Sequence, residues 1–158
     1  MKAATISELK KELMEQPEKR LVELCIEIIK YKKENKELLT YLLFEANDRA
    51  TFVLNIKKEI NVLYDEINTD LNLYFIKKSI RKILRLVNKY SKYIGDKAIE
   101  IDLILYFLNC LRTSGIQYEK SKTLHNLYLS QIKKINSLIG DLHEDLQYDF
   151  RKELAELI

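Results

Sequence analysis

Glycine and proline are too scarce in this chain for a β-sheet architecture. The 158 residues include 3 glycines and 1 proline, whereas average usage of ~7 % and ~5 % would give roughly 19 in a chain of this length. A β-sandwich or barrel turns every ~8 to 12 residues, and its turns draw heavily on these two residues. The glycines also lie far apart, which excludes a recognisable glycine-rich phosphate loop and a nucleophile elbow. We therefore expect an all-α fold.

Apolar residues recur at spacings of three and four along most of the sequence, which predicts seven or eight amphipathic helices. The expected helices span residues 6–15, 17–33, 36–46, 49–67, 72–94, 97–113 and 117–157. Their connections are very short, so neighbouring helices should run antiparallel. The prediction is a single all-α domain over residues 1–158, with a kink or a separate C-terminal helix after Gly140. Its helical hairpins would form a compact bundle or a short α-solenoid of the armadillo or HEAT type.

Several polar residues stand where helix ends are expected. Thr5 and Glu8 have the spacing of a capping box, and Gly95 suits a left-handed C-terminal cap. Asparagine and aspartate accept hydrogen bonds from the free amides of a first helical turn. The further N-terminal caps predicted on this basis are Asn35, the pairs Asn47–Asp48 and Thr69–Asp70, and Asp96.

The apolar pattern also predicts where the core lies. Residues 97–113 are apolar on most sides, which indicates a central helix. Glu100 and Asp102 lie on this helix, and a partly buried carboxylate there needs a lysine or arginine partner. We expect structural ion pairs rather than catalytic groups. The two stripes expected to face inward nearer the N-terminus contain Leu21, Leu24, Cys25, Ile28 and Tyr31, and Leu38, Leu39, Leu42 and Leu43.

Basic residues are concentrated in one segment. The formal net charge is only +3, but residues 72–97 hold eight basic residues and one acidic residue. Six of them, which we call the basic face, recur at spacings that place them opposite the apolar stripe of helix 72–94. Like charges at this spacing repel each other, so an acidic group should compensate them. The basic face consists of Lys78, Arg81, Lys82, Arg85, Lys89 and Lys92.

Three kinds of acidic group are candidates for this compensation. Residues 141–158 hold six acidic residues, and together with Asp65, Glu66 and Asp70 they would neutralise the basic face within the chain. A nucleic acid would do so with its phosphates, with stacking on Tyr74, Tyr90 and Tyr93 at the helix ends. An acidic protein or a homodimer partner is the third candidate. Whether helix 141–157 lies across helix 72–94 separates the first candidate from the other two.

No residue pattern indicates catalysis, a metal or a cofactor. The two histidines, His125 and His143, lack the Glu-x-x-His spacing of di-metal bundles. Cys25 and Cys110 each have apolar neighbours, which is typical of reduced core cysteines. We therefore expect a non-enzymatic protein that needs no cofactor and holds no metal.

The apolar runs are too short for a membrane span. The longest uninterrupted run, Leu103–Leu108, falls far below the ~20 residues that cross a bilayer. The first residues contain no apolar core of a secretory signal. These features predict a cytoplasmic protein that does not bind membranes.

Two stretches carry a family resemblance. Residues 21–45, which include the run KYKKENKELLTYLLFE, and residues 80–90, IRKILRLVNKY, are the matching segments. Over about residues 1–115 the chain resembles a small family of uncharacterised bacterial all-helical proteins. The resemblance implies an all-helical fold, and it implies no activity and no site residues.

The sequence favours a non-enzymatic binding module that docks an acidic partner, with nucleic acid as first candidate, on the basic face. The alternative is a protein–protein adaptor or a homo-oligomeric helical scaffold in which the basic face is neutralised internally. A surplus of outward apolar residues would distinguish this alternative. The residues expected to point outward in that case are Leu54, Leu73, Leu86, Leu103 and Leu129.

Overall fold

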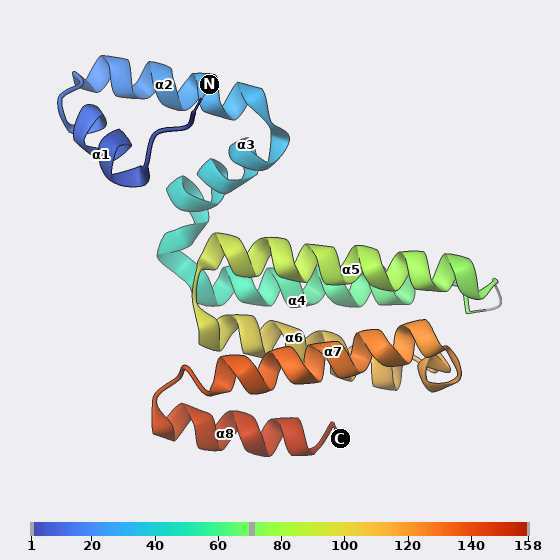
Figure 1. Cartoon of the computed structure of the whole chain (residues 1–158). Coiled ribbons are helices and arrows are strands. Elements are labelled where there is room, and N and C mark those ends of the chain that lie inside the picture. The colour runs from blue at the N-terminus through green and yellow to red at the C-terminus, as the bar shows by residue number, and fades with distance from the viewer. Residues whose placement is uncertain (1, 70–71, 158) are drawn as a thin grey trace. The chain divides into compact units, whose positions relative to one another are not determined.

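The computed structural model describes residues 2–69 and 72–157, and its regular structure there is all-α, as the sequence predicted. Short π- and 3₁₀-helical turns lie at Tyr41–Glu45, Ala46–Asp48 and Tyr118–Lys120. The α-helices of the described residues are shown in Figure 1. They are α1 (Ile6–Met14), α2 (Glu18–Tyr31), α3 (Lys33–Thr40), α4 (Arg49–Asp65), α5 (Leu73–Ile94), α6 (Lys97–Thr113), α7 (Lys122–Ile139) and α8 (Glu144–Ala155).

Contacts between residues divide the chain into two units. The first, which we call the N-terminal unit, is Met1–Glu45 and contains α1 to α3. The second, which we call the bundle, is Ala46–Ile158 and contains α4 to α8. The single domain expected from the sequence stays a prediction.

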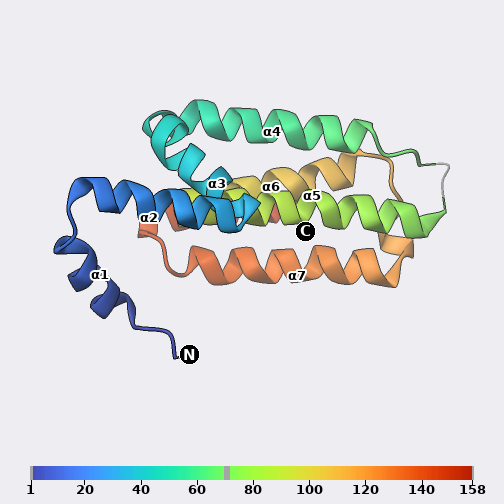
Figure 2. The same cartoon turned by 90° about the horizontal axis from the view of Figure 1, so that it is seen from above.

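The bundle consists of antiparallel helical hairpins. Gly95 and Asp96 alone connect α5 to α6, and Gly95 adopts the left-handed conformation (φ 67°) that the sequence predicted for a C-terminal cap. Consecutive helices run in opposite directions (Figure 1). Viewed from above, α4 and α7 lie on either side of α5 (Figure 2). The helical structure is interrupted at residues 140–143, between α7 and α8, which confirms the break expected near Gly140.

Helix α6 is the centre of the bundle, as its apolar composition predicted. It packs against α4, α5, α7 and α8, so most of its side chains meet another helix. Leu103, one of the residues expected to point outward, is fully buried here. The buried residues of α6 are Ile101, Leu103, Ile104, Leu105, Phe107, Leu108 and Leu111.

Both carboxylates of α6 form ion pairs with neighbouring helices, as expected. Lys57 of α4 donates a hydrogen bond to Asp102 at 2.8 Å, and the ammonium nitrogen of Lys134 on α7 lies 2.6 Å from a carboxylate oxygen of Glu100. The four side chains retain 24 % to 37 % exposure. Each pair therefore joins α6 to a helix packed against it, while water still reaches the charges.

Most of the predicted helix caps are confirmed. Thr5 and Glu8 form the capping box at the start of α1, and Asp48 and Asp96 accept hydrogen bonds from the first turns of α4 and α6. The prediction that Asn35 caps a helix was wrong, because Asn35 lies inside α3. Its side-chain amide donates a hydrogen bond to the carbonyl of Ile28. Asn72 caps α5. Of the pair expected there, Asp70 lies outside the described residues.

The N-terminal unit leaves much of its apolar stripes exposed. Among residues 2–45, Tyr41 is the one buried side chain. The inward orientation expected of Ile28 and Tyr31 on α2, and of Leu42 and Leu43, was wrong: all four are more than half exposed. The physical reason is size, because about 45 residues are too few to enclose a core of their own.

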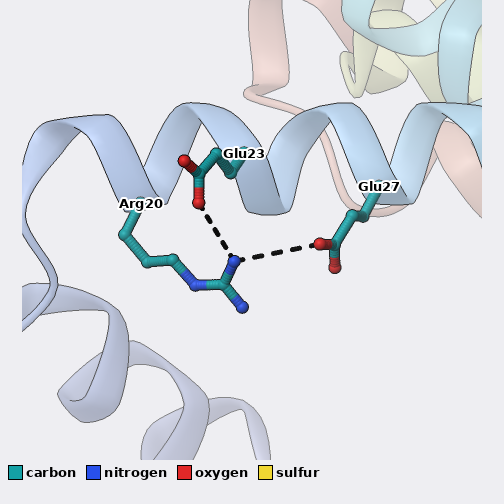
Figure 3. A network of polar contacts seen from close by, with 3 residues as sticks. All are labelled: Arg20, Glu23 and Glu27. Carbon is teal, nitrogen blue, oxygen red and sulfur yellow. Dashed lines mark hydrogen bonds and ion pairs between the residues drawn. The ribbon is translucent and has the colours of Figure 1, made fainter.

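On the polar side of α2, Arg20 lies 3.2 Å from Glu23 and 3.8 Å from Glu27 (Figure 3).

Candidate functional site

Helix α5 separates apolar and basic side chains onto opposite faces. With 3.6 residues per turn, its buried residues fall within one narrow sector that faces the rest of the bundle. Lys78, Arg85 and Lys92 recur every seven residues along the line opposite this sector. Arg81, Lys82 and Lys89 flank that line. The buried residues of α5 are Ile76, Ile80, Ile83, Val87, Ser91 and Ile94.

The basic face is largely exposed. Five of its six side chains are exposed, and Lys89 is partly buried with its ammonium 4.7 Å from the centre of the Tyr90 ring. Within the part of the chain that the structure describes, the five exposed residues form no ion pair. Their mutual repulsion is therefore relieved only by water and salt in the described structure. The five exposed residues are Lys78, Arg81, Lys82, Arg85 and Lys92.

A surface hollow of about 490 Å³ runs along one flank of α5. Asn88 at one end accepts a hydrogen bond from Lys134 at 3.0 Å, so this flank faces α7. Lys77 lines the hollow but was not among the predicted site residues. Its side chain projects about 90° from the centre of the basic face, so its position in the sequence does not place it opposite the apolar stripe. The lining residues are Tyr74, Lys77, Lys78, Arg81, Leu84, Arg85 and Asn88.

The three tyrosines expected to offer stacking differ in their surroundings. Tyr90 packs edge-on against Phe52 of α4, with ring centres 5.6 Å apart, and donates a hydrogen bond to Glu59. The Tyr93 ring lies 6.0 Å from that of Tyr90 and is partly buried. Tyr74 is 66 % exposed and lies in the lining of the hollow. Of the three, Tyr74 is therefore the ring most open to a ligand.

The acidic C-terminal helix lies away from the basic face. Helix α8 packs against α6 and α7, and these two helices stand between it and α5 in the bundle (Figure 1). Two carboxylates of residues 141–158 have partners outside α5: Asp141 accepts a hydrogen bond from Lys97 at 2.9 Å, and Asp145 lies 3.5 Å from the neighbouring His143. Helix α8 therefore does not lie across α5.

The two cysteines differ from expectation because neither is a fully buried core residue. Cys25 is exposed, and Cys110 is partly buried beside Asn61, with 3.6 Å between the sulfur and the amide oxygen. Burial raises the pKa of the Cys110 thiol, which lowers its reactivity at neutral pH. In the described ranges no group of three or more histidine, cysteine or acidic side chains is placed to hold a metal ion.

Within residues 2–69 and 72–157, no helix is both long and apolar enough to span a membrane. Comparison of the chain with protein-family models, with curated proteins and with solved structures gives no match. The resemblance to a small bacterial family therefore stays a prediction.

Proposed function

We propose that this protein is a non-enzymatic binding module that docks an acidic partner, a nucleic acid, on the basic face of α5. One observation carries the proposal. Among the residues that the structure describes, the five exposed residues of the basic face have no ion-pair partner, and they lie on a single helix whose opposite side is anchored in the bundle core. Because the helix backbone is already ordered, the segment that carries these charges need not fold when a polyanion binds.

The length of the row suits a phosphate backbone. From Lys78 to Lys92 the helix rises by about 21 Å at ~1.5 Å per residue. Nucleic acid presents a phosphate every ~3.4 Å along each strand, so several phosphates lie within reach of the row. Each phosphate that a lysine or arginine neutralises releases a counterion, and the gain in entropy favours binding at low salt. The affinity should therefore fall as salt rises.

The first prediction is that charge reversal of the basic face abolishes this binding. The variant Arg81→Glu, Lys82→Glu, Arg85→Glu replaces three attractive contacts by repulsive ones. We expect at least ~100-fold weaker binding to a nucleic acid, because three phosphate contacts are lost. The same loss should lower the slope of log affinity against log salt by about 3. Fluorescence anisotropy across a salt series measures both quantities.

The matched control reverses three basic residues outside α5. Lys120, Lys122 and Lys133 are exposed, and their replacement by glutamate leaves the protein with the same net charge as the α5 variant, three below zero from +3. We expect less than ~5-fold weaker binding from this general change of charge. Equal losses in the two variants would show that only net charge matters, and the proposal would be wrong.

The N-terminal unit favours a second candidate function, self-association or docking of a protein partner. A hollow of about 630 Å³ on its surface is lined by Ile6, Leu9, Lys10, Leu13, Met14 and Leu21. Ile6 and Met14 are 87 % and 78 % exposed. Residues 1–45 carry nine basic and nine acidic side chains, so two copies of the unit would not repel each other through net charge. Apolar surface of this kind marks interaction sites.

The second prediction concerns the mass of the protein in solution. If the N-terminal unit pairs with a second copy, light scattering should show a mass rising from 18.8 kDa toward twice that value with concentration. The variant Leu9→Lys, Leu13→Glu keeps the net charge and places charges in the hollow. We therefore expect the concentration at which half of the protein is paired to rise ~10-fold. A constant mass of 18.8 kDa for the wild type at every concentration would exclude pairing of copies.

A further inference from the structure

We infer that the nucleic acid docked on α5 is single-stranded, with a base stacked on the ring of Tyr74 and the adjoining phosphates bound by Lys78, Arg81 and Arg85. The inference rests on the proposed function and names its ligand class. All four side chains line the same hollow on the flank of α5. The observation behind it is one exposed aromatic ring beside a row of basic groups that form no ion pair within residues 2–69 and 72–157.

The four residues form one continuous row. Their spacings of four, three and four residues keep them on the same side of the helix. The row rises by about 16 Å from Tyr74 to Arg85 at ~1.5 Å per residue, which corresponds to about four or five nucleotides of a stacked strand. Sites on proteins that bind single strands commonly cover ~4 to 16 nucleotides. A short strand therefore matches the length of the row.

The Tyr74 ring is held but remains accessible. Its centre lies 5.5 Å from that of Phe75, with the two planes at 82°, so the rings meet edge to face. This contact leaves Tyr74 66 % exposed. A flat ring with this exposure offers a surface on which a base can stack, and the phenol also supplies a hydrogen-bond donor.

The hollow also has the composition of a nucleotide site. Leu84 contributes an apolar wall, and Lys77, Lys78, Arg81 and Arg85 surround it with positive charge. Its volume of about 490 Å³ lies within the range of ~300 to 1,000 Å³ typical of small-ligand pockets. Asn88 adds an amide whose oxygen is already bound by Lys134, so its amide protons remain as donors.

The ring distinguishes a single strand from a duplex. In a duplex the bases stack on one another, and a side chain reaches their faces only by wedging between steps and kinking the helix. In a single strand the bases turn outward and stack on exposed aromatic rings, whatever their sequence. Both forms offer phosphates to the basic face. Tyr74 should therefore contribute to binding of single strands and not of duplexes.

The experiment measures anisotropy of two labelled probes with the full chain. One probe is an oligothymidylate of about 20 nucleotides, and the other is a mixed-sequence duplex of about 20 base pairs. We expect Tyr74→Ala to weaken binding of the oligothymidylate by about 5- to 100-fold and to leave duplex binding unchanged. Tyr74→Phe should retain nearly full affinity, because it keeps the ring. Tyr148→Ala is the matched control, since Tyr148 is 73 % exposed on α8.

Each alternative outcome overturns one proposal. If Tyr74→Ala changes neither probe, or both equally, while reversal of Arg81, Lys82 and Arg85 abolishes binding, the single-strand inference is wrong and the proposed function stands. If the wild type binds neither probe at low salt, the proposed function itself is wrong. Because Tyr74 is largely exposed, its replacement should leave the circular dichroism melting curve unchanged, which shows that any loss comes from the site.

Discussion

Replacement of Phe107 by alanine should destabilise the bundle by about 3 to 5 kcal/mol. Phe107 is fully buried on α6 and lies 5.9 Å, ring centre to ring centre, from Tyr64 of α4. Its removal forfeits the transfer free energy of the ring and leaves a cavity that the surrounding helices fill only in part. A small domain has only ~5 to 15 kcal/mol of net stability, so this single change removes a large share. Urea unfolding followed by circular dichroism measures the loss.

Two further variants make this prediction testable even if the alanine variant does not fold. Phe107→Leu keeps more of the volume and should cost less than about 1.5 kcal/mol. Phe75→Ala makes the same chemical change at a residue that is 52 % exposed, and its cost should stay below about 1 kcal/mol. Similar losses for Phe107→Ala and Phe75→Ala would contradict the central position of α6.

Alkaline pH should unfold the bundle through Tyr64. Its hydroxyl donates a hydrogen bond to the carbonyl of Phe107, and burial raises the pKa of the phenol far above its ordinary value, with a smaller contribution from Cys110. The folded state therefore keeps a proton that the unfolded chain loses. The contribution of Tyr64 to the free energy of unfolding is fully present below the ordinary tyrosine pKa of about 10. Above that pH the free energy of unfolding should fall by about 1.4 kcal/mol per pH unit until Tyr64 ionises in the folded state.

The comparison that isolates Tyr64 uses urea unfolding between about pH 8 and pH 12. Tyr64→Phe loses the hydrogen bond to Phe107, at a cost of about 1 kcal/mol at neutral pH, but its stability should decline less steeply above pH 10. Burial also raises the pKa of Cys110 and of Tyr128, and both groups remain in the variant. Tyr148→Phe, at an exposed ring, should keep the wild-type decline. Identical declines for wild type and Tyr64→Phe would show that Tyr64 does not limit alkaline stability.

The helices themselves were predictable because their signals are local. The capping box of Thr5 and Glu8 and the left-handed Gly95 depend on residues within one helical turn. The expected helix 97–113 coincides with α6. The prediction of a helix over residues 36–46 was less accurate, because α3 ends at Thr40 and a π-helical turn follows. Asn35 shows the limit of such signals, since its side chain reaches back to Ile28 instead of capping a helix.

The candidate site was predictable in part for the same reason. The side chains of the basic face share one side of a single helix, so their spacing in the chain is enough to place them together. Their partners were not predictable, because partners come from other helices. The sequence left open whether the acidic residues 141–158 cover α5, and packing places α8 against α6 and α7. Tyr90 likewise packs against Phe52, which lies on another helix.

Taken alone, the order of residues determined that this chain is all-α, where most of its helical segments lie, and which side of α5 carries the charge. These properties arise from interactions between residues three or four positions apart. The tertiary structure decided which apolar faces are covered: Leu103 is buried in the centre of the bundle, while Leu42 and Leu43 stay exposed. Burial depends on how many other helices surround a side chain, and periodicity along one helix carries no information about its neighbours.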